Sequence, residues 1–150
     1  MRILALDLGN KRIGVAVSDE LEVLARALTT LPARGRNADA EAIAALAAAQ
    51  EAGRVILGLP LSLSGEDGPQ ALKVRKFGTY LAGVLSVPLE YWDERYTTVE
   101  AARLLRANGV APRKQRDQID ATAAAILLQS YLDSHAPSRL PGQDPGTSTA

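Results

Sequence analysis

With 150 residues, of which 47% are hydrophobic and 23% charged, the chain has the composition of a single globular domain, and disorder throughout is excluded. Seventeen basic residues balance seventeen acidic ones, so the net charge neither favours nor excludes a polyanionic partner. The absence of cysteine excludes disulfides, thiolate nucleophiles and cysteine-ligated zinc. No apolar run reaches the ~18 residues of a membrane span and no signal-like segment precedes the first predicted strand, so we expect a cytoplasmic protein without a membrane partner.

Three strands are predicted at the amino-terminal end. Residues 2–8 and 13–18 are rich in apolar β-forming residues and are separated by the turn formers Gly9 and Asn10, which predicts an antiparallel hairpin. Residues 24–31 are predicted to form a third strand that ends at Pro32.

Helical and strand patterns alternate through the rest of the chain. The predicted elements are a helix from Asp39 to about Gly53, a buried strand at 54–60, a helix at 69–84, a strand at 87–94, a helix from Thr97 to Gly109 and a helix at about 117–133. Residues 134–150 contain three prolines and almost nothing apolar, so we expect a disordered tail after one domain at 1–133. This order predicts an α/β fold with a mixed five-stranded sheet, three antiparallel strands followed by parallel strands, flanked by helices.

Asp7 interrupts the apolar run of the first strand. Its position predicts a carboxylate near the carboxyl end of a central strand, where open α/β sheets bind their ligands. An unpaired carboxylate there would cost several kcal/mol or would stay protonated, so Asp7 needs a partner. The alternative is that Asp7 only caps the turn at 8–10.

Two further acidic positions stand at places where the predicted fold would bring them near Asp7. Asp93 and Glu94 follow the fifth strand, at the same sheet edge if that strand is parallel to the first; alternatively they anchor the next helix or form a salt bridge. Asp120 shares a helix face with apolar residues at 123–128, which must pack on the sheet. Its alternative role is the third position of a helix that Asp117 caps.

Carboxylates from a first strand, a later strand end and a core-facing helix would form an all-oxygen site, which suits Mg²⁺ or Mn²⁺. Two such ions can activate water and stabilise the leaving oxygen during hydrolysis of a phosphodiester. The acidic positions therefore predict metal-assisted hydrolysis.

The chain resembles the YqgF/RuvX family of bacterial RNase H-like proteins in four segments: LDLGNKRIGVAVSD, VILGLPLSLSGEDGP, DERYTTVEA and DQIDATAAAILLQSYL. The resemblance extends over residues 2–133. It implies an RNase H-like fold and a metal-dependent nuclease centre. Family members are associated with resolution of Holliday junctions and with nuclease processing of pre-16S ribosomal RNA.

The resemblance also implies roles for the acidic residues. Asp7 corresponds to the first-strand acid and Asp120 to the last-helix acid; Asp93 and Glu94 are both candidates for the middle acid, and Glu94 is favoured. Asp7, Glu94 and Asp120 are then the expected metal ligands. Better-studied RNase H-like resolvases carry an acid at the end of the fourth strand, where this chain has Gly58, Leu59 and Pro60, so the metal site is expected to be incomplete without substrate phosphate.

Basic and aromatic residues beside these acids predict contacts with nucleic acid. A loop at 106–116 contains four basic residues and no acid, and is either a phosphate clamp or a solvated linker. Arg95 is either a phosphate contact or the partner of Asp93 or Glu94. The residues expected to bind nucleic acid are Lys11, Arg12, Arg95, Tyr96, Arg113, Lys114 and Arg116, with Tyr96 placed to stack on a base.

Three functions are compatible with these features. The first is a Mg²⁺- or Mn²⁺-dependent endonuclease acting on structured or precursor RNA, in the maturation of pre-16S ribosomal RNA. The second is a Holliday junction resolvase, which requires two active centres and hence a homodimer, whereas the RNA nuclease is compatible with a monomer. The third is a non-catalytic RNA-binding or transcription-associated factor, which the missing fourth-strand acid would favour.

Overall fold

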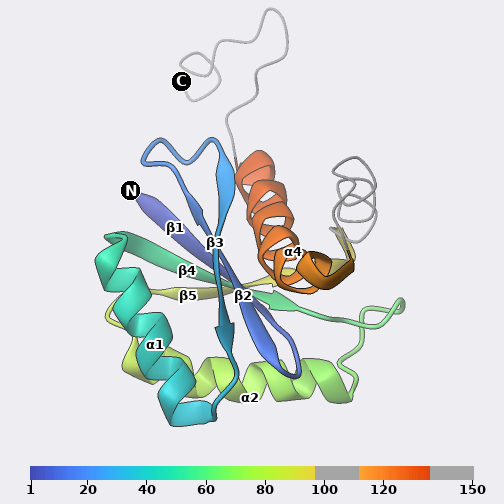
Figure 1. Ribbon diagram of the computed structural model, residues 1–150. Coiled ribbons are helices and arrows are strands. Elements are labelled where there is room, and N and C mark those ends of the chain that lie inside the picture. Colours follow the sequence, from blue (N-terminus) through green and yellow to red (C-terminus); the bar gives the residue numbers. More distant parts are fainter. Residues whose placement is uncertain (97–111, 136–150) are drawn as a thin grey trace, which may run out of the picture.

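The computed structural model describes the backbone of residues 1–96 and 112–135 and the side chains of residues 1–95 and 121–135. The elements, shown in Figure 1, are β1 (Arg2–Leu8), β2 (Arg12–Ser18), β3 (Ala25–Pro32), α1 (Arg36–Ala49), β4 (Ala52–Leu59), α2 (Pro69–Val84), β5 (Leu89–Asp93), the short 3-10 helix η1 (Glu94–Tyr96) and α4 (Pro112–His135). The predicted helix from Thr97 to Gly109 and the predicted tail lie outside the described residues, apart from the end of α4.

The described strands form one mixed sheet in the order β3-β2-β1-β4-β5. β1 pairs antiparallel with β2, and β2 antiparallel with β3, whereas β4 runs parallel to both β1 and β5. The predicted architecture is therefore confirmed. Because β1, β4 and β5 are parallel neighbours, their carboxyl ends meet at one edge of the sheet.

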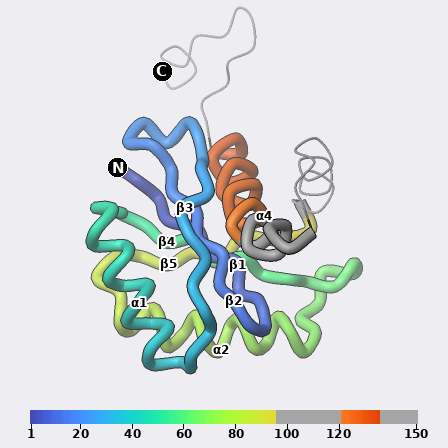
Figure 2. The backbone as a smooth tube through the Cα atoms, in the orientation of Figure 1, coloured from blue at the N-terminus to red at the C-terminus, as the bar shows by residue number. Residues whose placement is uncertain are grey.

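The sheet separates two layers of helices, which the tube in Figure 2 shows on its two sides. Side chains of β1 alternate between the faces: Leu4 and Leu6 pack with α1 and α2, and Ile3 and Ala5 pack with α4. β4 is buried on both faces, which is why its sequence reads as a continuous apolar run. Asp7 continues the alternation and stands on the α4 face.

Helix ends differ from their predicted positions at two amino termini and at one carboxyl terminus, since α1 ends at Ala49 and Gly53, its predicted stop, lies in β4. α1 begins at Arg36, before the predicted Asp39, and α4 begins at Pro112, before the predicted start near residue 117. Proline suits the first position of a helix because its missing N–H has no partner there. Asp117 is therefore an interior residue of α4 and not its cap, so the capping alternative for Asp117 and Asp120 was wrong.

None of the helices in the described part of the chain has the length and apolar character needed to cross a bilayer.

Candidate active site

Asp7 and Glu94 meet at the edge where the parallel strands end. Asp7 is the penultimate residue of β1, and Glu94 opens η1 directly after β5, two strands away. The carboxyl group of Glu94 forms a side-chain hydrogen bond with Asp7. The hairpin turn closes through its own backbone, with the Gly9 N–H donating to the Arg12 carbonyl at 2.8 Å, so Asp7 faces a second carboxyl group instead of capping the turn.

The surroundings of Glu94 favour its protonated form. Burial, the hydrogen bond and negative charge of Asp7, and the charge of Asp93 raise the pKa of Glu94 to about 9, from a usual value of 4.5. A divalent cation between two carboxylates would remove the repulsion and displace the proton, because oxygen anions are the ligands that Mg²⁺ and Mn²⁺ prefer. The donor set therefore fits such an ion.

Gly58 provides the space that the Glu94 side chain occupies. It is the residue of β4 between these two strands, and it pairs with Trp92 of β5. A Cβ atom at this position would lie 2.6 Å from Glu94 Oε1 and 2.5 Å from Leu127 Cδ1. Position 58 must thus be small for Glu94 to occupy this space and reach Asp7, a role of Gly58 that sequence reasoning missed.

Asp93 is held in a structural bridge with Arg95. Its carboxylate accepts the Arg95 backbone N–H at 3.0 Å, Nε at 2.8 Å and Nη2 at 2.5 Å. The side-chain hydrogen bond from Arg95 is the main reason that the pKa of Asp93 is lowered. The structure thus brings Glu94, and not Asp93, into contact with Asp7, and it realises the bridge that the sequence left as an alternative for Arg95.

Arg95 also ties η1 to the loop before α2. Its Nη1 donates to the carbonyl of Leu63 at 3.3 Å and lies 3.5 Å from the carbonyl of Ser62. Leu63 is 97% exposed at this loop. The guanidinium of Arg95 therefore holds the loop before α2 beside η1.

The third predicted acid, Asp120, lies in α4, and its side chain is outside the described residues. Its helix position is four residues before Ala124 and seven before Leu127, both of which are buried against the sheet. α4 contacts η1, and Leu127 lies beside Gly58. By helix periodicity, position 120 continues the row of α4 that contains Ala124 and Leu127.

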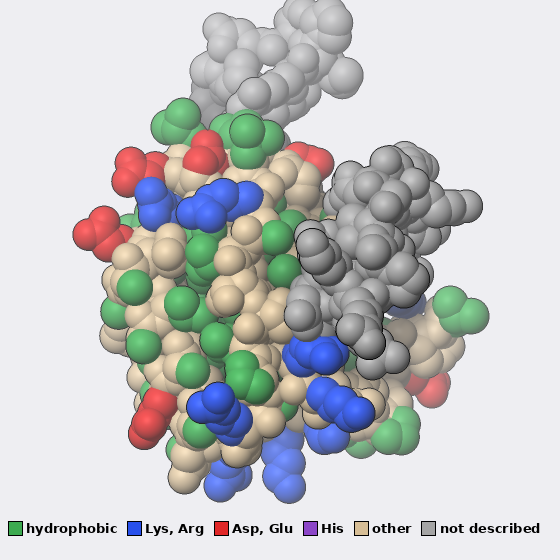
Figure 3. Space-filling view, viewed as in Figure 1, with side chains coloured by type: hydrophobic (Ala, Val, Ile, Leu, Met, Phe, Trp, Pro, Cys, Tyr) green, Lys and Arg blue, Asp and Glu red, His purple; other side chains and the backbone are tan. Residues whose placement is uncertain are grey.

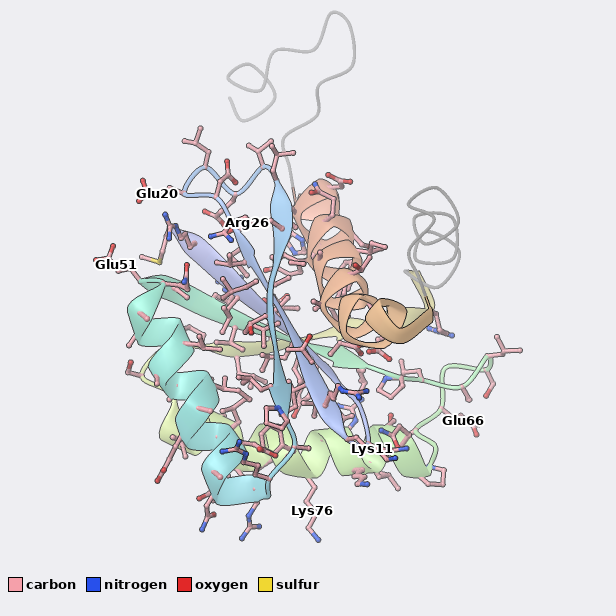
Figure 4. The ribbon with its side chains drawn as sticks, in the orientation of Figure 1. Lys11, Glu20, Arg26, Glu51, Glu66 and Lys76 are labelled. Carbon is pink, nitrogen blue, oxygen red and sulfur yellow. The ribbon has the colours of Figure 1, made fainter. Side chains whose placement is uncertain are left out.

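Of the residues predicted to bind nucleic acid, the structure describes the side chains of Lys11, Arg12 and Arg95. Lys11 is exposed on the β1–β2 turn (Figure 4), and Arg12 is half-buried at the start of β2. Tyr96 ends η1, with its side chain outside the described residues.

The basic segment at 106–116 was predicted to be a loop, and this is wrong for its last five residues. Arg113, Lys114 and Arg116 lie in the first turns of α4, because Pro112 starts the helix there. Their side chains, and all of Arg106, are outside the described residues. Any phosphate contact from the described part of this segment would come from a helix.

Within the side chains that the structure describes, no group of three or more acidic or histidine residues is arranged to hold a metal ion. Asp7 and Glu94 form a pair, and the third predicted ligand is Asp120. Substrate phosphate is a further source of oxygen ligands for Mg²⁺-type ions.

Comparison with known proteins agrees with this architecture. A sequence model of the RuvX family, described as "Holliday junction resolvase", matches residues 1–134. A relative from Anaeromyxobacter dehalogenans, named "Putative pre-16S rRNA nuclease", is 49% identical over 137 residues, which cover 91% of this chain and 100% of the relative. A relative from Chloroflexus aggregans with the same name is 48% identical over 132 residues, covering 88% of this chain and 93% of the relative.

Solved structures show the same fold at low sequence identity. RuvC of Thermus thermophilus in complex with a Holliday junction superposes with a TM-score of 0.57 at 17% identity, covering 89% of this chain and 94% of RuvC. The Holliday junction resolvase of fowlpox virus superposes with a TM-score of 0.53 at 14% identity, covering 89% and 99%. The predicted RNase H-like fold is therefore confirmed.

Proposed function

Because this chain belongs to the RuvX family, we propose that it is a metal-dependent endonuclease that hydrolyses phosphodiester bonds, with precursor 16S ribosomal RNA as its substrate. The observation that carries this proposal is the contact between Asp7 and Glu94 at the carboxyl edge of the parallel strands. The names of the relatives from Anaeromyxobacter and Chloroflexus support the choice of substrate. An RNA-processing role of this kind places the protein in the cytoplasm.

The proposed site uses three carboxylates. Asp7 and Glu94 would hold Mg²⁺ or Mn²⁺, and Asp120 in α4 would be the third ligand. Such ions, when bound, would supply activation of the attacking water and neutralisation of the leaving oxygen. Arg95 keeps Asp93 engaged, so Glu94 alone of the two presents its carboxyl group to Asp7.

The substrate strand approaches over the β1–β2 turn. Lys11 and Arg12 on this turn adjoin Asp7, and Arg113, Lys114 and Arg116 begin α4, the helix that carries Asp120. Positive side chains on both sides of the acids would hold phosphates next to the scissile one. Tyr96 completes the proposed nucleic-acid contacts by stacking on a base, whereas Arg95 is engaged by Asp93.

Cleavage of labelled pre-16S RNA by the Asp7→Asn variant tests this function. We expect wild-type protein to cleave in Mg²⁺ or Mn²⁺, and the variant to lose cleavage while it keeps its fold. Asp133→Asn is the matched control, because Asp133 is an exposed carboxylate at the far end of α4 and should leave cleavage unchanged. Full cleavage by a homogeneous, folded Asp7→Asn protein would reject the nuclease proposal.

A Holliday junction resolvase is the second candidate function. The description of the family favours it, and the RuvC fold is shared. Resolution needs two active centres, so this function predicts a homodimer and paired symmetric nicks on a synthetic four-way junction. A monomer that cleaves precursor RNA and leaves the junction intact would exclude it.

The third candidate is a non-catalytic RNA-binding factor, which Gly58 in place of a fourth-strand acid favours. This candidate predicts that Asp7→Asn protein supports ribosomal RNA maturation in cells as well as wild-type protein does. Impaired maturation with the variant would exclude it.

A further inference from the structure

A cavity of about 320 Å³ opens on the face of the sheet opposite the Asp7–Glu94 pair. It lies between the β1–β2 turn and the first turns of α1 and α2, and its apolar lining consists of Leu8, Ile13, Ala33, Val74 and Phe77. Small-molecule sites in proteins have volumes of about 300 Å³ and above and are mostly apolar with a few polar groups. This cavity has the size and lining of a site for a small ring system.

Polar groups stand at the rim of this cavity. Asn10 and Gln70 line the cavity, and their side chains carry amides, which both donate and accept hydrogen bonds. Asp39 also lines the cavity, and its Oδ1 accepts the backbone N–H of Arg34 at 2.9 Å, which fixes the segment before α1. Amides and a carboxylate around an apolar floor are the groups that read the edge of a nucleobase.

Basic side chains that form no salt bridge within the described part of the chain surround the opening of this cavity. Lys73 lines the cavity, and Lys11 and Arg34 are exposed on the adjoining turn and loop. For these three side chains, no carboxylate in the described part of the chain lies within salt-bridge distance, and Figure 3 shows basic side chains gathered at this end of the molecule. The rim therefore favours an anionic group next to the ring.

The cavity and the acidic pair share one short stretch of backbone. Asp7 and Leu8 are consecutive residues of β1, so Asp7 stands on the α4 face while Leu8 lines the cavity on the other face. The exposed turn that follows carries Lys11 (Figure 4), and its residues Gly9 and Asn10 line the cavity. A strand with one phosphate at Asp7 and Glu94 would cross this turn to place a nearby nucleotide at the cavity.

We propose that this cavity binds the base of a nucleotide close to the scissile phosphate, in the same strand that is cleaved. The base packs against Phe77 between Asn10 and Gln70, and its phosphate lies at Lys73 and Lys11. This proposal rests on the nuclease function proposed above and adds a subsite that selects unpaired nucleotides, because a base held in a duplex cannot enter a cavity.

The chain contains a single phenylalanine, so selective labelling of phenylalanine gives NMR signals from the cavity alone. The full-length protein, in chelator to prevent cleavage, is titrated with a short single-stranded RNA and with a series of the same RNA carrying one abasic nucleotide at each position in turn. We expect the intact RNA to shift the Phe77 signals. One abasic position should abolish the shift and weaken binding, whereas the other positions should not.

Two charge-reversal variants provide the matched comparison. Lys73→Glu changes a cavity-lining residue, and Lys76→Glu makes the same change on the same helix at an exposed residue that does not line the cavity. We expect Lys73→Glu to weaken RNA binding by about tenfold, the loss typical of one charge-assisted hydrogen bond, and Lys76→Glu to weaken it much less. Both residues are exposed, so the fold should survive in both variants.

The outcomes separate this proposal from its alternatives. Equal losses from the two variants, or an abasic series without a sensitive position, would overturn the proposal. Phe77 signals that respond to adenosine or uridine monophosphate but not to the RNA would assign the cavity to a free nucleotide and would also overturn it. If the cavity shows no base binding but cleavage still depends on Asp7, the nuclease function stands and only the subsite is rejected. Cleavage that does not depend on Asp7, which is a separate measurement, would reject the nuclease function itself.

Discussion

Replacing Glu94 with glutamine should change how the stability of the metal-free protein depends on pH. In the folded protein the pKa of Glu94 is about 9, because of burial and of Asp7, against an ordinary value of 4.5. Between these two pH values the folded state keeps a proton that the unfolded state has released. The folded state is therefore favoured at low pH, and this stabilisation is lost as the pH rises toward 9. Glutamine keeps the shape and cannot ionise.

The magnitude follows from one proton. Each pH unit in this window lowers the free energy of unfolding of the wild-type protein by about 1.4 kcal/mol relative to the variant. Near pH 5 the protonated Glu94 resembles glutamine, so the two proteins should be similarly stable. Between pH 5.5 and 7.5 the Glu94→Gln variant should gain roughly 3 kcal/mol over the wild-type protein.

Urea unfolding at a series of pH values, in chelator, measures this difference. Glu66→Gln is the control, because Glu66 is an exposed carboxylate in the loop before α2, and its curve should stay parallel to that of the wild-type protein. Saturating Mn²⁺ should stabilise the wild-type protein most at high pH, since the ion replaces the proton on Glu94. Wild-type and Glu94→Gln curves that run parallel from pH 5 to 8 would refute the raised pKa of Glu94.

Three further predictions concern the same edge of the sheet. Gly58→Ala should lower the free energy of unfolding by about 1–3 kcal/mol in urea and reduce cleavage, because the added Cβ meets both Glu94 and Leu127; unchanged stability would contradict the packing described above. Arg95→Ala should free Asp93 and loosen the loop before α2, which would be measured as faster amide exchange at residues 62–66. Equal exchange rates in the variant and the wild-type protein would show that Arg95 does not hold the loop. Mn²⁺ affinity measured by calorimetry should increase about tenfold for each unit by which the pH is raised, up to pH 9, because the ion displaces one proton. The Glu94→Gln variant should lose this dependence, and a flat profile in the wild-type protein would show that no proton is displaced.

Local sequence patterns were sufficient for most of the fold. The apolar runs of β1 and β2 on either side of Gly9 and Asn10 predict a hairpin, and the continuous apolar run of β4 predicts a strand buried on both faces. These patterns depend on residues close together in the chain. Helix ends were less certain, and the start of α4 at Pro112 was missed because the basic residues that follow it look like a solvated loop.

The candidate site was likewise predicted only in part from the sequence. The residues alone were enough to place Asp7 at the carboxyl end of a buried strand, because the apolar run around it identifies the strand and the turn formers that follow mark its end. The choice between Asp93 and Glu94 required the packed chain, because adjacent residues of a short turn point in different directions and each finds a different partner, Arg95 or Asp7.

The structure alone also explained Gly58 and revealed the cavity beside Phe77. Both depend on contacts between segments far apart in the chain: β4 with η1 and α4 in one case, and a hairpin turn with two helix ends in the other. Residues close together in the chain determine the hydrophobic periodicity and the ends of each helix and strand, whereas the space between these elements is set by how they pack. That space decides which carboxyl groups touch and where a ligand can enter.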